Sequence, residues 1–463
     1  MTLQPYNSDQ TLVSQYSAAA VIGLGATGYS VVRYLRARGL DVVVLDSRSN
    51  PPLAQQLSDN YPEIESHFGE FDYAHIAQMS LVVASPGVAL TEPVLREAKY
   101  EGARIVGDIE LFLEENQSPV IAVTGSNGKS TVVTLVGQMC KYSGLHTLVA
   151  GNIGLPALDA LTDQKSFDVA VLELSSFQLE TTYQVPAESA AILNVSADHM
   201  DRYDSMGDYV LAKARILRGA KRVVLPKHDE QLKQISNVSD VLHFDLDEPS
   251  KESDFGVKRQ SNYRWLMHGD ERLIKLSDIP LIGLHNVKNV LSAFALVSFL
   301  KLPLSSLVEA VKAFKGLSHR MQTVALEGNV AWVNDSKATN IGATSTALKN
   351  LEKDVVWIAG GQGKGADFSE LRDAVTSNVK QLILIGEDAD QIESALDNLL
   401  PINKVQSMDE AVLLAHQLAS DNSIVLLSPA CASFDMYRGF EHRGQVFTSS
   451  VEKLLAKSNG GDV

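Results

Sequence analysis

The sequence predicts an α/β protein of three consecutive domains, each built around a largely parallel β-sheet. Short runs of valine, isoleucine and leucine alternate with helical patterns along the chain, as expected for strands that helices cover on both faces. Glycine-rich or polar turns follow several of these strands, at Gly23, at Gly125 and after Val333. At 463 residues the chain is also too long for a single hydrophobic core.

The first domain is expected over residues 1–107. A short strand rich in alanine and valine runs into Gly23, Gly25 and Gly28, ahead of a predicted helix. The next strand ends at Asp46, close to ~20 residues after these glycines, where dinucleotide-binding domains carry a ribose-binding acid. A further strand and helix are predicted at 81–87 and 93–100. Taken alone, the segment is typical of a Rossmann-like domain that binds a dinucleotide.

One run in the second predicted domain is the most informative of the chain, Val120–Thr131. A β-branched strand leads into a turn at Gly125, followed by Lys129, two hydroxyl side chains and an apolar helix. This order presents backbone N–H groups and a helix N-terminus to an anion, with Lys129 for the outer phosphates and Ser130 for magnesium. Val123 stands where the usual phosphate-binding loop has its first glycine. The run therefore predicts a nucleoside triphosphate site with irregular spacing.

The rest of this domain, expected over residues 108–315, carries polar side chains at its strand ends. Glu173 ends one strand and is expected to share a crevice with Lys129 and to hold magnesium, because ligands bind outside the carboxyl ends of parallel strands. His199 lies in a polar loop after the next strand. Lys213 falls in a predicted helix and, like most lysines, would by default be exposed. Strands are predicted at 169–173, 190–194 and 222–225, an irregular insertion at 227–280, and helices from 286 and at 305–314.

The third domain is expected over residues 316–463, with a Rossmann-like alternation of strands and helices. Polar turns follow three of its strands, at Asn334–Asn340, Gly360–Phe368 and Ser428–Asp435, and Lys337 and Lys364 add positive charge to two of them. Backbone amides in such turns bind anions, so we expect a binding site along one sheet edge. Strands are predicted at 330–333, 355–358, 382–385 and 424–427, and helices near 344–351, 391–399 and 409–418.

Composition narrows the possible partners and compartment. A net charge of −16 argues against a nucleic-acid binder, which would carry clustered lysine and arginine. The two cysteines provide no disulfide framework and suit a reducing compartment. The start of the chain lacks a secretion signal, and the longest apolar helix candidate, Val290–Leu300, is too short to span a bilayer. We therefore expect a cytoplasmic protein without nucleic-acid partners or membrane insertion.

These motifs in this order resemble the Mur ligase family of ATP-dependent amino-acid-adding enzymes, over essentially the whole chain. The resemblance lies in Thr124–Thr131, Leu172–Glu180, Asp198–Tyr203, Asn334–Asn340 and Ser428–Asp435. The first of these is the family's own form of the phosphate loop, which accounts for the irregular spacing. The other four are similar to the branch that adds D-glutamate.

The resemblance implies an activity and its participants. ATP would phosphorylate the carboxylate of UDP-N-acetylmuramoyl-L-alanine, and D-glutamate would attack the acyl phosphate to form an amide in peptidoglycan precursor synthesis. Two magnesium ions are implied, and Lys213 would carry a CO₂-derived carbamate, since a bare ammonium would repel magnesium and Lys129. We expect a monomer in the bacterial cytoplasm.

The resemblance also assigns site residues by motif. The implied catalytic residues are Lys129, Glu173, His199 and Lys213, and the implied metal ligands are Ser130, Glu173, His199 and carbamylated Lys213. ATP would contact Gly125, Ser126, Asn127, Gly128, Lys129, Ser130, Thr131, Asn286, Asn289, Arg320 and Asp335. The nucleotide sugar would contact Gly25, Ala26, Thr27, Asp46, Ser47, Arg48 and Asn152, and D-glutamate would contact Lys337, Thr339, Lys364, Ser433 and Phe440.

Other functions remain open from the sequence. Another Mur-family or folylpolyglutamate-type amide ligase would use the same phosphate loop. An NAD-dependent oxidoreductase would use the turn at Gly23 to Gly28 and Asp46, although it has no need of Lys129 and Ser130. A regulatory ATP-binding module would leave Glu173 and the three turns of the last domain without a purpose.

Overall fold

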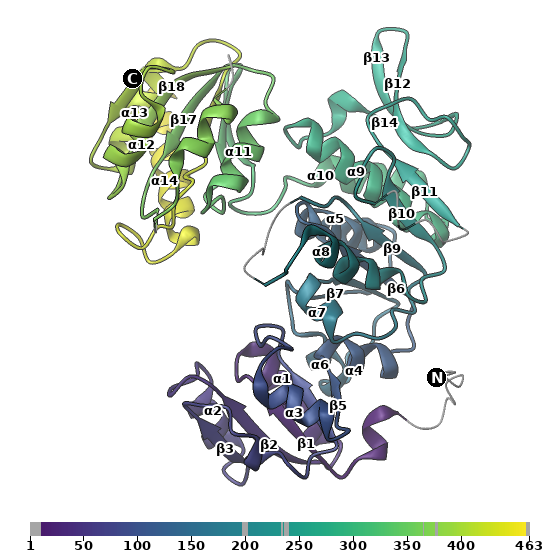
Figure 1. The fold of residues 1–463 in the computed structure, drawn as a ribbon. Helices are drawn as coiled ribbons and strands as arrows, with labels where there is room; N and C mark the ends of the chain where they lie inside the picture. Colours follow the sequence, from purple (N-terminus) through teal and green to yellow (C-terminus); the bar gives the residue numbers. More distant parts are fainter. Residues whose placement is uncertain are drawn as a thin grey trace. The chain divides into compact units, whose positions relative to one another are not determined.

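The computed structural model describes residues 11–196, 202–232, 235, 240–363, 365–375 and 378–459. For residues 457–459 it describes the backbone alone. Three β-sheets, each flanked by helices, follow one another along the chain (Figure 1). The chain forms two compact units. One comprises the chain up to Lys275 together with Asn289–Val311, and the other comprises Leu276–Lys288 and Lys312–Val463.

The first sheet has five parallel strands in the order β3-β2-β1-β4-β5, which is the order of the first five strands of a Rossmann fold. The strands are β1 (Ala18–Ile22), β2 (Asp41–Asp46), β3 (Glu65–Phe68), β4 (Leu81–Ala84) and β5 (Arg104–Val106), with helices α1 (Ala26–Ala37), α2 (Ala54–Asn60) and α3 (Pro93–Tyr100). The turn between β1 and α1 is tight. A Cβ on Gly28 would lie 1.8 Å from the carbonyl oxygen of Gly23, and Gly23 itself has φ +94°. The predicted fold of this segment is confirmed.

The second sheet has nine strands in the order β14-β13-β12-β11-β10-β9-β6-β8-β7. Six strands pair in parallel with one another, namely β6 (Val120–Thr124), β7 (Thr147–Gly151), β8 (Val169–Glu173), β9 (Ser189–Ile192), β10 (Val223–Pro226) and β11 (Val241–Phe244). Strand β12 (Phe255–Gln260) is parallel to β11, and β13 (Tyr263–His268) and β14 (Glu271–Lys275) follow it as an antiparallel meander. The predicted irregular insertion at 227–280 is therefore wrong. These strands bury few side chains, among them Leu266, Met267 and Ile274, and their other positions are mostly polar.

Helices of this region hold the strand ends in place. They are α4 (Asp108–Glu115), α5 (Lys129–Tyr142), α6 (Ala157–Thr162), α7 (Ser176–Glu180), α8 (Met206–Ala214), α9 (Leu284–Val297) and α10 (Leu304–Ala313). Helix α7 begins with a capping box, in which the Ser175 hydroxyl accepts from the Gln178 N–H and the Gln178 side chain accepts from the Ser175 N–H.

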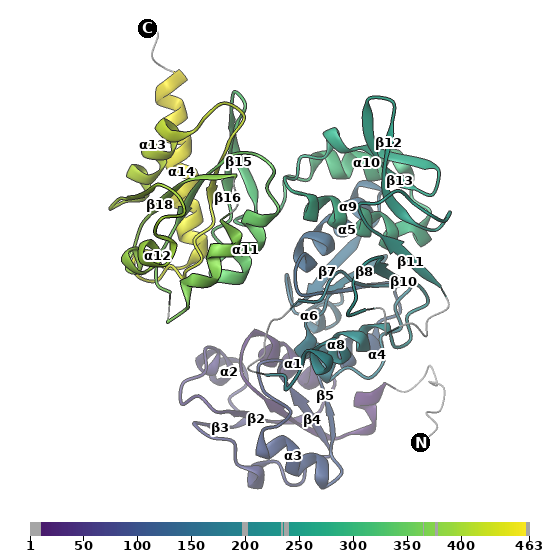
Figure 2. The same cartoon turned by 45° about the horizontal axis from the view of Figure 1, so that its top comes forward.

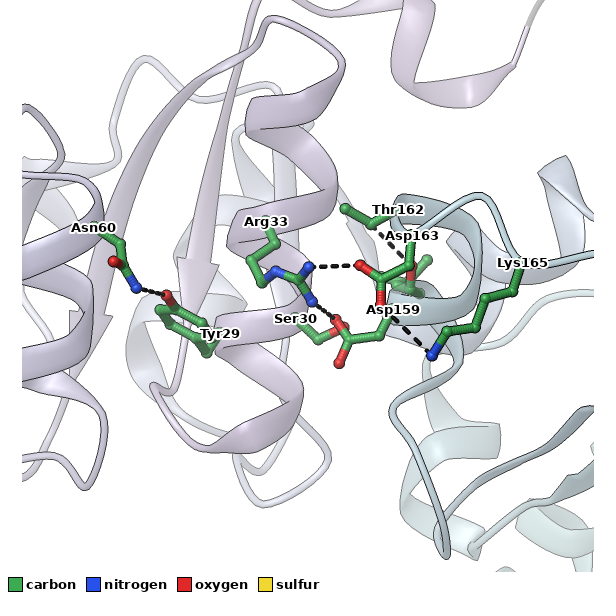
Figure 3. A network of polar contacts seen from close by, with 9 residues as sticks. Tyr29, Ser30, Arg33, Asn60, Asp159, Thr162, Asp163 and Lys165 are labelled. Carbon is green, nitrogen blue, oxygen red and sulfur yellow. Dashed lines mark hydrogen bonds and ion pairs between the residues drawn. The ribbon is translucent and has the colours of Figure 1, made fainter.

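The first two sheets share one hydrophobic core and a polar seam. Buried side chains from both, such as Tyr34 and Leu172, belong to the same cluster. At its edge, Arg33 of α1 donates to Asp159 of α6 and to Asp163 at the end of that helix, each at 2.7 Å (Figure 3). The helix that follows the first glycine-rich turn is thereby fastened to α6.

The third sheet has six strands in the order β15-β16-β20-β17-β18-β19, parallel except for the β15–β16 pair. The strands are β15 (Gln322–Glu327), β16 (Val330–Asn334), β17 (Val355–Ala359), β18 (Val379–Leu384), β19 (Ile402–Lys404) and β20 (Ile424–Leu427). Helices α11 (Ile341–Lys349) and α12 (Ala389–Leu396) pack with Trp357 on one face, while α13 (Met408–Leu418) and α14 (Phe440–Asn459) pack with Trp332 on the other (Figure 2). The long helix α14 was not predicted from the sequence.

The close approach at Gly28 generates a prediction about stability. We expect Gly28→Ala to lower the melting temperature by roughly 5 °C or more, because the added methyl group collides with backbone that cannot move aside. Gly87→Ala is the matched control, since a Cβ there meets nothing within 4 Å. Thermal melts followed by circular dichroism compare the two variants, and equal melting temperatures would contradict the steric argument.

Candidate functional site

The phosphate loop lies between the end of β6 and the start of α5. Gly125 and Gly128 have φ +155° and φ +85°, and Gly128 precedes the first residue of the helix. Asn194, which follows β9, fixes the loop: its side-chain oxygen accepts from the Asn127 N–H at 2.8 Å and its amide donates to the Asn127 carbonyl at 3.0 Å. Asn289 of α9 lies against the same turn, because a Cβ on Gly128 would lie 2.5 Å from its Oδ1 atom. The loop is thus shaped before any ligand arrives.

Two lysines converge on one carbonyl in this loop. Lys129 Nζ donates to the Gly125 oxygen at 2.8 Å and to the Ser126 oxygen at 3.0 Å, and Lys213 Nζ donates to the same Gly125 oxygen at 2.9 Å. Lys213 is 1% exposed, so the default expectation of an exposed lysine is wrong. Two like charges this close repel strongly in a buried setting. A negative charge close to the two ammonium groups would offset this repulsion.

Glu173 supplies such a charge at the end of β8. It pairs in register with Val123 of β6, so the two strands end side by side. Its Oε1 atom accepts from the Asn152 amide at 2.9 Å, whereas Oε2 is buried and has no hydrogen-bond partner among the described residues. Ser130, in the first turn of α5, is also buried. A buried carboxylate oxygen that lacks a donor among the described residues fits the oxygen ligands that Mg²⁺ requires.

Three further residues were predicted for the phosphate site. His199 lies outside the described residues. Asn286 is buried on α9, and its amide donates to the Ile282 carbonyl at 2.7 Å. Thr131 follows Ser130 in the first turn of α5.

A cavity of about 530 Å³ opens beside the first glycine-rich turn. It is lined by all seven residues that the sequence assigned to the nucleotide sugar, namely Gly25, Ala26, Thr27, Asp46, Ser47, Arg48 and Asn152. The sequence did not assign the remaining lining residues to this site, namely Gly23, Phe71, Ser85, Pro86, Gly87, Val88, Gly151 and Gln178. Several of these follow β4, whose carboxyl end adjoins that of β1 in the sheet. Their position directly after a parallel strand is the sequence signal that could have identified them as lining residues.

Asp46 organises this cavity through its hydrogen bonds. Its Oδ2 atom accepts from the Leu24 N–H at 2.7 Å, and both carboxylate oxygens accept from the Arg48 guanidinium, at 2.8 and 2.6 Å. Burial acts to raise the pKa of Asp46, but the hydrogen bonds from Arg48 and Leu24 prevail and hold that pKa below its usual value. Asp46 therefore stays ionised and holds Arg48 at the cavity wall.

In the other unit, three polar turns meet at the carboxyl edge of the third sheet. The strands before them, β16, β20 and β17, are adjacent. Gln362 and Ala432 exchange two backbone hydrogen bonds, at 3.0 and 2.9 Å, and the Ala430 N–H donates to the Ala338 carbonyl at 3.0 Å. A Cβ on Gly361 would lie 2.3 Å from the Ala432 oxygen. The turns at 334–340, 360–368 and 428–435 thus form one connected rim.

The residues predicted to bind the amino acid lie on this rim or next to it. Lys337 Nζ sits 3.9 Å above the ring of Phe440, the first residue of α14. Burial and the neighbouring charge of Arg320 lower the pKa of Lys337. Ser433 is buried and Thr339 is half-buried, whereas Lys364 lies outside the described residues.

Arg443 is a residue that sequence reasoning missed. It is 1% exposed and reaches from α14 to two of the turns. Its guanidinium donates to the Ser336 hydroxyl and carbonyl at 3.0 and 2.9 Å, and to the Cys431 and Ala432 carbonyls at 3.0 and 3.2 Å. An arginine can satisfy this many acceptors from one fixed plane. Only the helical spacing of Arg443 with Phe447 and Val451 hinted that it faces inward.

Asp335 is buried below the same rim. Its carboxylate accepts from the Ser428 hydroxyl at 2.9 Å and from the Met321 N–H at 3.1 Å. Burial raises the pKa of Asp335 to about 7, against the lowering effects of these two hydrogen bonds and of Arg320. The Asp335 carboxyl therefore loses its proton as the pH rises through the neutral range.

Comparison with known proteins gives one consistent family. Residues 17–107 match the model of the Mur ligase MurD-like N-terminal domain, residues 123–297 that of the Mur ligase middle domain, and residues 319–431 that of the Mur ligase glutamate ligase domain. A protein of Pseudomonas aeruginosa named UDP-N-acetylmuramoylalanine–D-glutamate ligase is 44% identical over 96% of this chain and all of its own length. A protein of the same name from Legionella pneumophila strain Paris is 45% identical over 95% of this chain and all of its own length.

Solved structures show the same fold. The UDP-N-acetylmuramate–alanine ligase of Thermotoga maritima, at 20% identity, superposes with a TM-score of 0.56 over 96% of this chain and all of that chain.

Within the part of the chain that the structure describes, the helices are all too short or too polar to cross a membrane.

The raised pKa of Asp335 predicts how stability depends on pH. In the unfolded chain an aspartate titrates near ~3.9, so between about pH 4 and pH 7 the folded state binds more protons than the unfolded state. The free energy of unfolding should therefore fall as the pH rises through this window. Asp335→Asn should flatten the fall.

Melting temperatures of both proteins at intervals from about pH 5 to pH 8 test this. The exposed Asp367 offers the control Asp367→Asn, which should keep the wild-type slope. An unchanged slope in Asp335→Asn would rule out this carboxyl as the source.

Proposed function

The chain belongs to the Mur ligase family, and from this we propose that it joins D-glutamate to UDP-N-acetylmuramoyl-L-alanine at the expense of ATP. The observation that carries the proposal is the likeness, over nearly the full length of both chains, to ligases of that name. The product would be a precursor of peptidoglycan. The NAD-dependent oxidoreductase considered from the first glycine-rich turn has no support, because this turn belongs to an amide-forming ligase.

The phosphate loop is the proposed site of ATP. Backbone N–H groups at the start of α5 would face the phosphates, and Lys129 would neutralise the phosphate that is transferred. Asn289, which lies against Gly128, would contact the same nucleotide, together with Asn286, Arg320 and Asp335. Attack of the substrate carboxylate on this phosphate gives an acyl phosphate and ADP.

The family uses magnesium, and the residues present here fit it. Ser130 and Glu173 would hold one ion, and we propose that His199 and carbamylated Lys213 complete a second position. The partnerless Oε2 atom of Glu173 supports this assignment. A bound ion would supply positive charge that stabilises the negative charge developing between two anions.

Lys213 is proposed to act as a carbamate. The ammonium would first lose one proton, and the neutral amine would then add to CO₂, forming an N–C bond and releasing a second proton, so that a cation becomes an anion. This change would turn the repulsion between Lys213 and Lys129 into attraction, which matches the convergence of both side chains on the Gly125 carbonyl. The burial of Lys213 protects such a group from water.

The cavity at the first sheet is the proposed site of the nucleotide sugar. Both oxygens of Asp46 already accept hydrogen bonds from Leu24 and Arg48, so this acid is committed to shaping the wall. Arg48 and the N-terminus of α1 would then face the diphosphate. Asn152 lines the cavity and also donates to Glu173, which links this site to the proposed metal ligand.

The rim of the third sheet is the proposed site of D-glutamate. Lys337, Thr339, Ser433 and Phe440, with Lys364, would hold its carboxylates. Its amine would attack the carbonyl carbon of the acyl phosphate, form the amide bond and release phosphate and a proton. We further propose that the enzyme works as a monomer in the bacterial cytoplasm, where its two buried, unpaired cysteines would stay reduced.

The carbamate proposal predicts a chemical rescue. Lys213→Ala should lose most activity, at least ~100-fold, because the site loses an anion. Added formate or acetate should restore part of it by filling the vacated position. The matched control is Lys221→Ala, which removes an exposed lysine paired with Glu188.

Carbon-13 NMR of the wild-type protein under ¹³CO₂ provides the second measurement. We expect a carbamate signal that Lys213→Ala lacks and Lys221→Ala keeps. A rescue that never appears, together with no such signal, would refute the carbamate.

The separation of the two binding regions predicts a split in the kinetics. Ser433→Ala should raise the KM for D-glutamate by ~10-fold or more, since it removes one hydrogen bond to a charged ligand, and should still form the acyl phosphate. Lys129→Ala should abolish the acyl phosphate itself. Borohydride trapping measures this intermediate, and Ser394→Ala on the exposed side of α12 is the control. Loss of the intermediate in Ser433→Ala with unchanged KM would contradict the assignment.

A further inference from the structure

Three metal-binding side chains gather at the edge of the first sheet. Glu65 and His67 belong to β3, the edge strand, and His75 belongs to the short 3-10 helix Tyr73–His75. Among the described residues this is the one group of three or more histidine, cysteine or acidic side chains whose ligand atoms all lie within 4.8 Å of one another. Neither the phosphate chemistry nor the proposed amino-acid site uses them.

The ligand atoms of the three side chains lie close enough together to share one ion. Glu65 and His67 are two residues apart on a strand, so their side chains share one face. Glu65 Oε1 lies 2.7 Å from His67 Nε2, and the imidazole rings of His67 and His75 stack with centroids 3.4 Å apart and planes at 15°. Ligand atoms around a tetrahedral ion with bonds of ~2.0–2.1 Å lie roughly 3.3 Å apart. The two imidazole planes are nearly parallel, so one ring must turn about its Cβ–Cγ bond before both nitrogen lone pairs can face the same ion.

The ligand atoms of Glu65, His67 and His75 indicate which kind of metal ion the group would bind. Two imidazole nitrogens and one carboxylate oxygen suit zinc and similar transition metals, whereas magnesium and calcium prefer oxygen ligands alone. We propose that Glu65, His67 and His75 form a binding site for a zinc-class divalent ion, with water in the fourth position. The site itself does not depend on the proposed function.

The position of this site connects it to the nucleotide-sugar cavity. The loop at 68–74 joins its two sides and carries Phe71, which lines the cavity. The start of the loop is already tied to the cavity wall, since the Gly69 N–H donates to the Asp46 carbonyl at 3.0 Å. A metal that joins β3 to His75 fixes the other end as well. Bound metal therefore orders the loop that holds Phe71.

Zinc titration of the metal-free full-length protein, with saturating magnesium present, tests the proposal. Isothermal calorimetry should find one more bound zinc per chain in the wild type than in the double variant His67→Gln/His75→Gln. Glu65→Gln alone should weaken that site ~10-fold or more. His228→Gln is the matched control, since His228 is an exposed histidine that also contacts a carboxylate, Asp247.

Hydrogen exchange provides a readout that does not require activity. Zinc should slow exchange of the amides at 68–74 in the wild type and in His228→Gln, but not in the double variant. Equal zinc stoichiometry in wild type and double variant, with unchanged melting temperatures in the absence of metal, would overturn the site. Zinc binding without slower exchange would overturn the link to the loop. Failure to bind UDP would instead count against the proposed function alone.

Discussion

The convergence of Lys129 and Lys213 on the carbonyl of Gly125 is the constraint on which the phosphate site depends. A glycine with a positive φ is needed to turn that oxygen toward both side chains, and α5 must start at Lys129 for its ammonium to fold back over the loop. Two cations this close, one of them buried, repel each other unless anions compensate. Glu173, the phosphates of a bound nucleotide and a carbamate would each reduce this repulsion.

At the third sheet, the proposed binding site consists of three loops, and contacts between these loops must hold them in position. Their contacts are mainly between backbone groups, and Arg443 ties two of them to α14 with four hydrogen bonds. A buried guanidinium whose hydrogen bonds are satisfied by carbonyls stabilises the loops without a paired carboxylate. Rigid support of this kind keeps Ser433 and Lys337 in position.

Much of the fold was predictable because it depends on local signals. The glycines after β1 and β6 mark strand-to-helix turns, and continuous apolar runs mark buried parallel strands. The antiparallel strands β12–β14 escaped prediction because they bury little surface and read as polar chain. The burial of Lys213 and the role of Arg443 also escaped it. Both depend on contacts between residues far apart in sequence, and their own neighbours in the chain give no sign of them.

The seam between α1 and α6 has a consequence for substrate choice. Ser30 and Arg33 bind Asp159, so the turn that begins α1 and the Asn152 loop that precedes α6 move as one piece (Figure 3). The cavity and the phosphate loop then lie at a fixed separation within the same body. This fixed separation selects substrates by length. A ligand bound in the cavity can react only if its other end reaches the phosphate loop. Molecules with the right groups but the wrong span would bind without reacting.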